Sequence, residues 1–124
     1  MAKCDQGYLC RVCGKEVDQM IDSELYLRFI IGEIDAELLH LSPECHLACN
    51  PTLSQFIDDE RFSKAVQAPE GFRIVDLDPR YVELRISLVS RGYRRLWEIR
   101  KERSRFPTIQ AYPLDQLGDE KLGQ

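Results

Sequence analysis

The sequence predicts a small α+β domain held together by a metal ion, and three observations support this fold class. Two cysteine-containing runs, at residues 9–17 and 42–51, lie about thirty residues apart. Between them, residues 24–31 form an aromatic and β-branched run that is typical of a strand. From residue 79 onward, apolar residues recur at spacings of three and four, which predicts a long amphipathic helix. We expect a metal-binding knuckle, a β-hairpin and a helix, followed by a short strand and the long C-terminal helix.

The β-hairpin is expected over residues 24–41. The run ELYLRFII shows partial alternation and ends at Gly32, so it is interpreted as the first strand. Residues 33–41 are expected to form the second strand, although the stretch AELL within them would also suit a helix.

The central helix is expected to begin at Pro51. Asn50 supplies a capping side chain directly before this proline, and proline is favoured at the first position of a helix. The run PTLSQFIDDERF then extends the predicted helix. Residues 71–79 are expected to form a short strand that ends in a second capping signal, Asp78 followed by Pro79.

The long helix carries an apolar stripe that continues across Gly92. Glycine costs about 1 kcal/mol relative to alanine in a helix interior, so another part of the chain is expected to pack closely against it. The stripe favours one continuous helix over two separate ones. Its main members are Val82, Ile86, Val89, Tyr93 and Leu96.

Length and composition limit the functions that the chain can have. A chain of 124 residues with 44% apolar residues can bury only a modest core, to which a metal ion would add stability. No apolar run resembles a signal peptide or a membrane span, so we expect a soluble, cytoplasmic protein. Disulfides are rare in that reducing compartment, and the five cysteines therefore indicate metal ligation or reactive thiols.

The first cysteine run supplies a pair of zinc ligands. A tight turn places the sulfurs of Cys10 and Cys13 on one side, and Gly14 permits the positive φ that such a turn needs. Cysteines can instead be buried apolar residues or a redox-active dithiol, but neither role explains why a second paired spacing follows. Cys4 is expected to be a free thiol.

The second run offers the other ligand pair, with one alternative. Cys45 and Cys49 are four residues apart, and His46 and Cys49 are three apart. Either spacing places two side chains on one face of a helical turn. We favour Cys45, because a thiolate left beside bound zinc would tend to displace an imidazole. The predicted ligands of a structural zinc ion are Cys10, Cys13, Cys45 and Cys49.

Four protein ligands leave no open position on zinc, so the ion is expected to close a loop and not to catalyse a reaction. One zinc-stabilised domain is expected over residues 1–106. It would contain a zinc module at about 8–60 and a helical extension at about 72–105. Residues 107–124 contain repeated proline and glycine breaks and are expected to form an extended, partly disordered tail.

The Cys-x2-Cys-Gly knuckle, hairpin and ligand-bearing helix resemble the treble-clef group of zinc-binding folds over about residues 8–60. That group includes ribosomal and transcription-associated modules, protein-interaction domains and HNH nucleases, so the resemblance implies an architecture and no single activity. The runs LLHLSP and CHLACN are similar to the nuclease pattern, with His40 as its general base. Leu39 stands where those nucleases have a second catalytic Asp or His. We therefore expect no catalysis, with a degenerate HNH-like nuclease as an alternative.

The net charge of -4 conceals a basic window. Residues 91–105 carry seven basic residues and two acids, whereas the rest of the chain has an excess of nine acids. Such a window is often only a solvated helix face with internal ion pairs. We expect an adaptor or regulatory subunit that docks on a protein, with nucleic-acid binding along the basic helix as the alternative. The predicted partner-binding residues are Arg91, Arg94, Arg95, Trp97, Arg100 and Tyr112.

Overall fold

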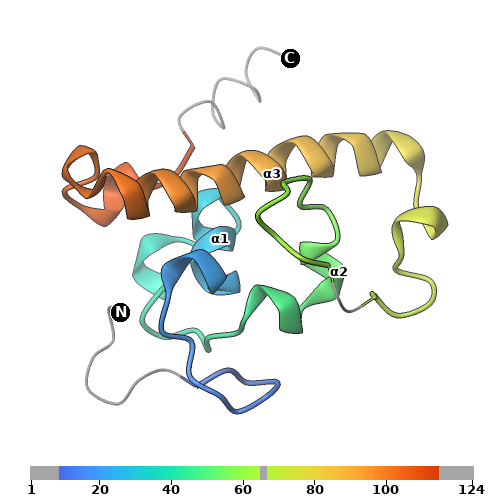
Figure 1. Cartoon of the computed structure of the whole chain (residues 1–124), viewed down its shortest axis with the longest axis horizontal. Coiled ribbons are helices and arrows are strands. Elements are labelled where there is room, and N and C mark those ends of the chain that lie inside the picture. The colour runs from blue at the N-terminus through green and yellow to red at the C-terminus, as the bar shows by residue number, and fades with distance from the viewer. Residues whose placement is uncertain (1–8, 65–66, 115–124) are drawn as a thin grey trace.

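The computed structural model describes residues 9–64 and 67–114. Within these ranges the chain forms three α-helices and several short 3-10 turns, and it contains no β-strand. The long helix α3 (Pro79–Lys101) runs along the molecule, and both α1 (Glu24–Ile30) and α2 (Pro51–Ser54) lie on one side of it (Figure 1). The predicted α+β class is therefore wrong, because the described part of the chain is mostly helical.

The predicted hairpin at residues 24–41 is wrong because its first half is helix α1. Ser23 caps this helix, and its hydroxyl accepts a hydrogen bond from the Tyr26 N–H at 3.0 Å. Residues 33–41 form turns around one 3-10 segment, Ala36–Leu38. Helix α1 is apolar on nearly every side, so its sequence shows no single stripe from which a helical period could be recognised. Its buried apolar residues are Leu25, Tyr26, Leu27, Phe29 and Ile30.

The predicted strand at residues 71–79 is also wrong, since Ile74–Asp76 is a 3-10 turn. The Asp76 carboxylate accepts hydrogen bonds from the N–H groups of Gly71 at 2.9 Å and Arg73 at 3.3 Å. Because this side chain satisfies backbone donors locally, the segment closes on itself and does not pair with a neighbouring strand.

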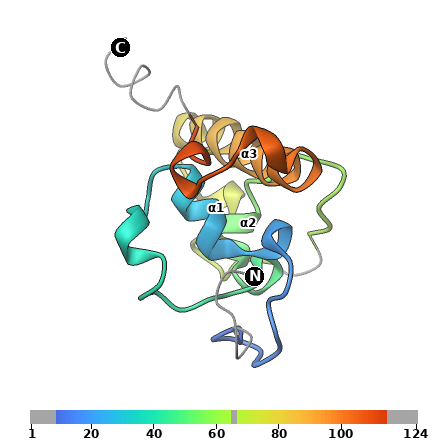
Figure 2. The same cartoon turned by 90° about the vertical axis from the view of Figure 1, so that its left-hand side faces the viewer.

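The predicted long helix is confirmed. The Asp78 carboxylate caps α3 by accepting a hydrogen bond from the Tyr81 N–H at 3.1 Å. The helix continues unbroken through Gly92. Figure 2 shows α1 lying below α3. A Cβ at Gly92 would lie 2.5 Å from the Ile31 side chain and 2.8 Å from that of Leu27. The glycine thus lets α1 pack directly against the α3 backbone.

The central helix is shorter than predicted. Asn50 caps it through its side-chain oxygen, which accepts a hydrogen bond from the Leu53 N–H at 3.2 Å. The helix itself ends at Ser54. No helix in residues 9–64 and 67–114 has the length and apolar character needed to cross a membrane.

Residues 107–114, predicted as the start of an extended tail, pack against α1 and α3. Tyr112 and Leu114 are buried, and the Leu114 N–H donates a hydrogen bond to the Ile30 carbonyl at 3.0 Å. The remainder of the predicted tail, residues 115–124, lies outside the described residues. Tyr112 makes tilted or edge-on ring contacts with Tyr26, Phe29 and Phe106.

Candidate metal centre

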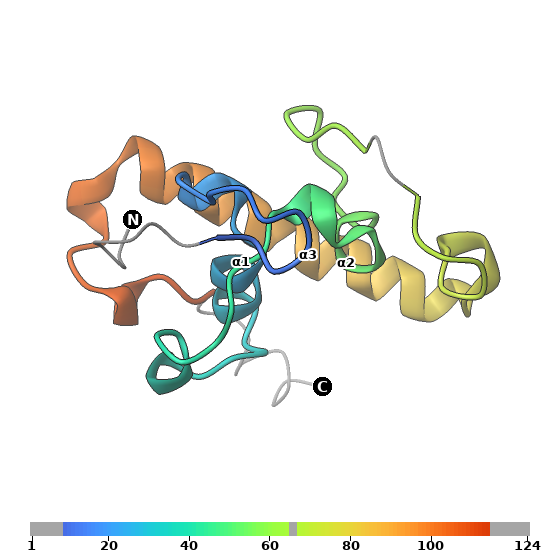
Figure 3. The ribbon, with the colours of Figure 1, turned by 90° about the horizontal axis from the view of Figure 1, so that it is seen from below.

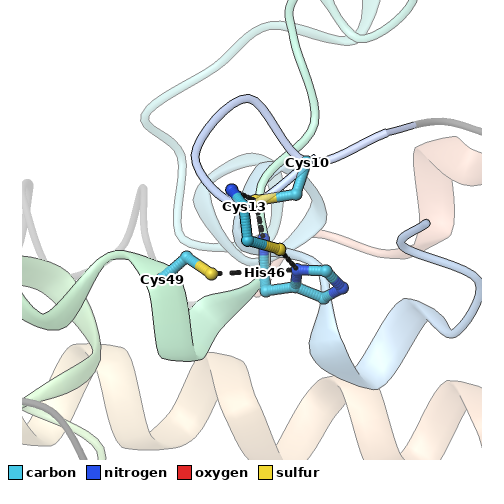
Figure 4. Close-up of side chains that lie close together, drawn as sticks. All are labelled: Cys10, Cys13, His46 and Cys49. Atoms are coloured by element: carbon cyan, nitrogen blue, oxygen red, sulfur yellow. Dashed lines mark hydrogen bonds between the residues drawn. The ribbon is translucent and has the colours of Figure 1, made fainter. Parts of the chain in front are cut away.

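Two loops that are distant in sequence bring four metal-ligating side chains together. Three cysteine sulfurs and one histidine ring nitrogen all lie within 4.8 Å of one another, so the cluster can hold a metal ion. Figure 4 shows the four side chains converging from the N-terminal knuckle and from the segment before α2. The four residues are Cys10, Cys13, His46 and Cys49.

The N-terminal knuckle is built by a tight turn, as the sequence predicts. Gly14 has a φ of +78°, and its N–H donates to the Cys10 carbonyl at 2.9 Å. This turn directs the N–H groups of Val12 and Cys13 toward the Cys10 sulfur, at 3.3 Å and 3.5 Å. A positive φ is readily adopted only by glycine, so the residue after the second cysteine sets the loop geometry.

Backbone donors favour the thiolate form of Cys10. Burial raises the pKa of this thiol, but hydrogen bonds from the N–H groups of Cys13, His46 and Val12 outweigh burial and lower it to about 5. The lowered pKa favours the thiolate, which is the form that binds metal. At Cys49 burial raises the pKa to about 12, with hydrogen bonds to the neighbouring cysteines adding to the shift. A metal ion would have to displace this proton.

His46 is oriented by a backbone carbonyl. Its Nε2 lies 3.0 Å from the Glu16 carbonyl oxygen, and because a carbonyl only accepts, Nε2 carries the proton. Nδ1 then directs its lone pair toward the sulfurs of Cys13, at 3.4 Å, and Cys49, at 3.9 Å. Histidine ligands in metalloproteins are commonly oriented by such a contact on the far ring nitrogen. The ring is thus held in the tautomer that can ligate a metal through Nδ1.

Cys45, the ligand favoured from sequence, is not among the four clustered donors. Its side chain is fully buried, and its thiol donates to the His46 carbonyl at 3.3 Å. Burial is the main reason that the pKa of Cys45 rises to about 12, so it is a protonated thiol. The structure places His46, the alternative left open by spacing, at the fourth position.

The backbone conformation explains why His46 belongs to the cluster and the adjacent Cys45 does not. Residues 44–46 are extended, with a parallel bridge between Cys10 and Glu44 and an antiparallel bridge between Ser23 and His46. Successive side chains on extended backbone leave on opposite sides, so only one of two adjacent residues can face the other three ligands. Helical spacing, which allowed either Cys45 or His46 to pair with Cys49, does not apply to this segment.

A buried carboxylate connects α1 to both ligand loops. Glu24 is 2% exposed, and its Oε2 accepts a hydrogen bond from the Asn50 side-chain amide at 2.9 Å. The same oxygen lies 3.6 Å from the guanidinium groups of Arg11 and Arg28. Arg11 lies within the knuckle and Asn50 directly follows Cys49. Seen from below, the knuckle lies in front of α1 and the start of α2 (Figure 3).

Two of the predicted partner-binding residues, Arg95 and Tyr112, make contacts within the domain. Arg95 donates hydrogen bonds to the carbonyl groups of Tyr112, at 2.6 Å, and Pro113, at 3.0 Å. Tyr112 itself is buried. Trp97 is half-buried, with the guanidinium groups of Arg61 and Arg100 at 4.9 Å and 5.2 Å from its ring centroid.

The remaining predicted residues lie apart from the metal centre. Arg94 is exposed on α3 and Arg91 is half-buried there. His40, the residue that the nuclease resemblance would make a base, is exposed in a turn and does not belong to the cluster. Cys4 lies outside the described residues.

No protein-family model, no curated protein and no solved structure matches this chain. The metal cluster is consistent with a zinc-binding group of folds. The described residues lack the hairpin that the treble-clef arrangement requires.

Proposed function

We propose that the protein binds one zinc ion through Cys10, Cys13, His46 and Cys49. The observation that carries the proposal is the convergence of these four donors within 4.8 Å. Thiolate and imidazole together are the ligands that zinc prefers in proteins. Tetrahedral zinc places sulfur and nitrogen ligands about 3.5 Å apart, and the measured separations of 3.4 Å and 3.9 Å from Nδ1 to two sulfurs are close to that value.

The proposed ion is structural. With three cysteines and one histidine the tetrahedral shell is complete, which leaves no position for a reacting water or substrate. The ion would close the loop between Cys13 and His46, which are 33 residues apart, and so stabilise a domain with a modest core. We propose accordingly that the protein is not an enzyme.

We further propose that the zinc-stabilised domain is an adaptor or regulatory module that binds a protein. Several large apolar side chains remain exposed around the start of α3, and adjacent exposed apolar residues favour protein contacts. Nucleic-acid binding has less support, because Arg95 donates its hydrogen bonds within the domain and Arg105 pairs with Glu102. The exposed apolar residues are Phe72, Val75, Tyr81 and Leu84.

The zinc proposal is tested by measuring metal in the full chain purified without added metal. Elemental analysis should return one zinc per chain, and a strong chelator should remove the ion together with the cooperative unfolding transition. Less than half an equivalent of zinc, or a transition unchanged by chelation, would contradict the structural role.

The adaptor proposal needs a separate test with a matched control. A tagged chain should retain a stoichiometric protein complex, and Leu84→Glu should lose it while retaining zinc. Ser104→Glu, at an exposed position beyond the far end of α3, should bind as the wild type does. Retention of nucleic acid that falls steeply with salt would favour the alternative instead.

A further inference from the structure

We propose that a cleft beside the metal centre binds a carboxylate joined to a flat apolar group. The cleft has a volume of about 330 Å³, near the lower end of the range for small-molecule sites. Its walls come from the knuckle, α1, α2, the turn before α3, and α3 itself. None of the four clustered metal ligands lines it, so this would be a second site with its own chemistry.

Two arginines face the cleft with unused hydrogen-bond donors. Arg11 and Arg28 each lie 3.6 Å from the same Glu24 oxygen, and Arg28 lies 3.7 Å from Glu33. These distances permit ion pairing but exceed the reach of a hydrogen bond. Within residues 9–64 and 67–114, neither guanidinium donates a hydrogen bond, although their side chains are only 43% and 37% exposed. A carboxylate is the acceptor that matches a guanidinium in geometry and charge.

A third arginine is already fixed in place. Arg85 donates a hydrogen bond to Glu33 at 2.6 Å, and its guanidinium lies 5.7 Å from the centre of the Phe56 ring. Its Nε is buried without a hydrogen-bond partner among the described residues. This arginine therefore supplies a pre-organised positive charge at the α3 side of the cleft.

The charges that line the cleft favour a single negative charge on the ligand. Three arginines line it together with two carboxylates, those of Glu24 and Glu33, so its formal charge is +1. A carboxylate would neutralise this charge, whereas a phosphate dianion would leave an excess negative charge beside Glu24, which is itself buried. The charge balance thus favours a carboxylate over a phosphate.

Part of the cleft wall is aromatic. The rings of Phe56 and Tyr81 meet edge to face with centroids 6.2 Å apart, and Phe72 and Tyr81 are 57% and 49% exposed. Gln55 holds the Phe72 segment in place, since its side-chain amide donates to the Phe72 carbonyl at 2.7 Å. A flat apolar group lying on this wall would cover exposed ring surface while its carboxylate reaches the arginines.

The carboxylate could belong to a free small acid or to a peptide, and the chemistry of the cleft is the same for both. The probes are therefore phenylacetate and a short peptide that ends in phenylalanine with a free terminal carboxylate. Phenylacetamide and the amidated peptide serve as uncharged controls. If the peptide binds more tightly than phenylacetate, the natural carboxylate belongs to a protein. If phenylacetate binds more tightly, the natural carboxylate belongs to a small molecule. Either result supports a carboxylate site.

The experiment is an NMR titration of the zinc-loaded full chain, following backbone amide shifts. Saturable shifts should appear around Phe72 and Tyr81, with a Kd on the order of 1 mM or below for a ligand of about ten non-hydrogen atoms. Arg28→Gln should weaken binding at least about tenfold, because it removes a charge-assisted contact. Arg80→Gln, an exposed arginine on α3 that does not line the cleft, should bind as the wild type does.

Arg28 pairs with the buried Glu24, so zinc content and spectral dispersion must first show that its variant is folded. If Arg28→Gln does not fold, Arg11→Gln supplies the same test from the more exposed side of the cleft. The proposal is overturned if no probe saturates, if the folded variant binds like the wild type, or if the uncharged controls bind equally well. Tighter binding of phenyl phosphate than of phenylacetate would also overturn the carboxylate assignment.

Discussion

His46 and Glu16 are joined by a hydrogen bond of 3.0 Å from the imidazole Nε2 to the backbone carbonyl. This contact fixes the tautomer of the ring and leaves Nδ1 facing the sulfurs of Cys13 and Cys49. It also ties the second ligand segment to the end of the knuckle. Backbone groups therefore orient the side chains of the candidate metal centre.

Substitution at the two neighbouring candidate ligands should give opposite results. His46→Ala removes a donor from the cluster and should weaken zinc binding by more than about a hundredfold, beyond the usual effect of losing a residue that only orients a ligand. Cys45→Ala should keep one zinc per chain and lower stability by about 1 kcal/mol through lost packing. Competition with a chelating dye measures both affinities. Zinc loss in the Cys45 variant with retention in the His46 variant would reverse the assignment.

Zinc affinity should fall as the pH is lowered, because protons compete for the ligands. Burial by itself lowers the pKa of His46, but hydrogen bonds with Cys10 and the Glu16 carbonyl raise it overall. The imidazole therefore takes up a proton at a higher pH than an ordinary histidine. Burial and hydrogen bonds to the neighbouring cysteines also raise the pKa of Cys49, so zinc must displace its proton as well. Zinc competition measured between pH 8 and pH 5 should show affinity rising steadily with pH. A flat profile would exclude these ligands.

Gly92→Ala should destabilise the protein even though alanine favours helices. The added methyl group would lie 2.5 Å from the Ile31 side chain, so α1 and α3 would have to separate. We expect a loss of about 1–3 kcal/mol from overpacking, against a gain of about 1 kcal/mol in helix propensity. Urea unfolding of the zinc-loaded protein measures the difference. Ser87→Ala, at an exposed α3 position, is the control and should be neutral or slightly stabilising; a stabilised Gly92 variant would show that the helices do not pack as described.

Asp59→Asn should remove a pH-dependent contribution to stability. Hydrogen bonds from the Arg61 side chain lower the pKa of Asp59 to about 2. A carboxyl with a depressed pKa stabilises the fold above its unfolded value near 3.8, and this contribution is lost as the pH falls toward 2. Because Arg61 is 41% exposed, the contribution is limited to about 1 kcal/mol.

The Asp59 prediction is checked by comparing urea unfolding of wild type and variant. With excess zinc keeping both proteins loaded, the stability gap should be equal at pH 7 and pH 5, because a carboxyl with a pKa of about 2 stays ionised throughout this range. A gap that already closes between pH 7 and pH 5 would contradict the low pKa.

Arg95→Met should release the segment at residues 107–114 from α3. The guanidinium donates to three carbonyl groups of that segment, and removing it leaves them unpaired at a cost of about 1–3 kcal/mol. Hydrogen exchange of the Leu114 amide should become at least about tenfold faster. Arg94→Met, at the exposed neighbouring position, should leave that exchange unchanged. Equal exchange in both variants would show that Arg95 does not hold the segment.

The sequence was most informative where local signals agreed. Asp78 and Pro79 mark the start of α3, and its one-sided apolar stripe predicts a helix across Gly92. Helix α1 was missed because its residues are buried on nearly all sides, which hides the helical period. Its best available signal was the capping residue Ser23, directly before the apolar run.

The candidate metal cluster was predictable only as far as local sequence signals determine it. The paired spacings identify the two loops, and Gly14 identifies the turn of the knuckle. The choice between Cys45 and His46 depends on extended backbone set by contacts with Cys10 and Ser23, which are distant in sequence. Spacing within one run carries no information about such long-range pairing.

X-ray absorption at the zinc edge tests the proposed metal centre most directly. The expected spectrum has three sulfur neighbours at about 2.3 Å and one imidazole nitrogen at about 2.0 Å, with no exchangeable oxygen. Four sulfur neighbours, or an oxygen from water in the shell, would contradict a closed site made by Cys10, Cys13, His46 and Cys49.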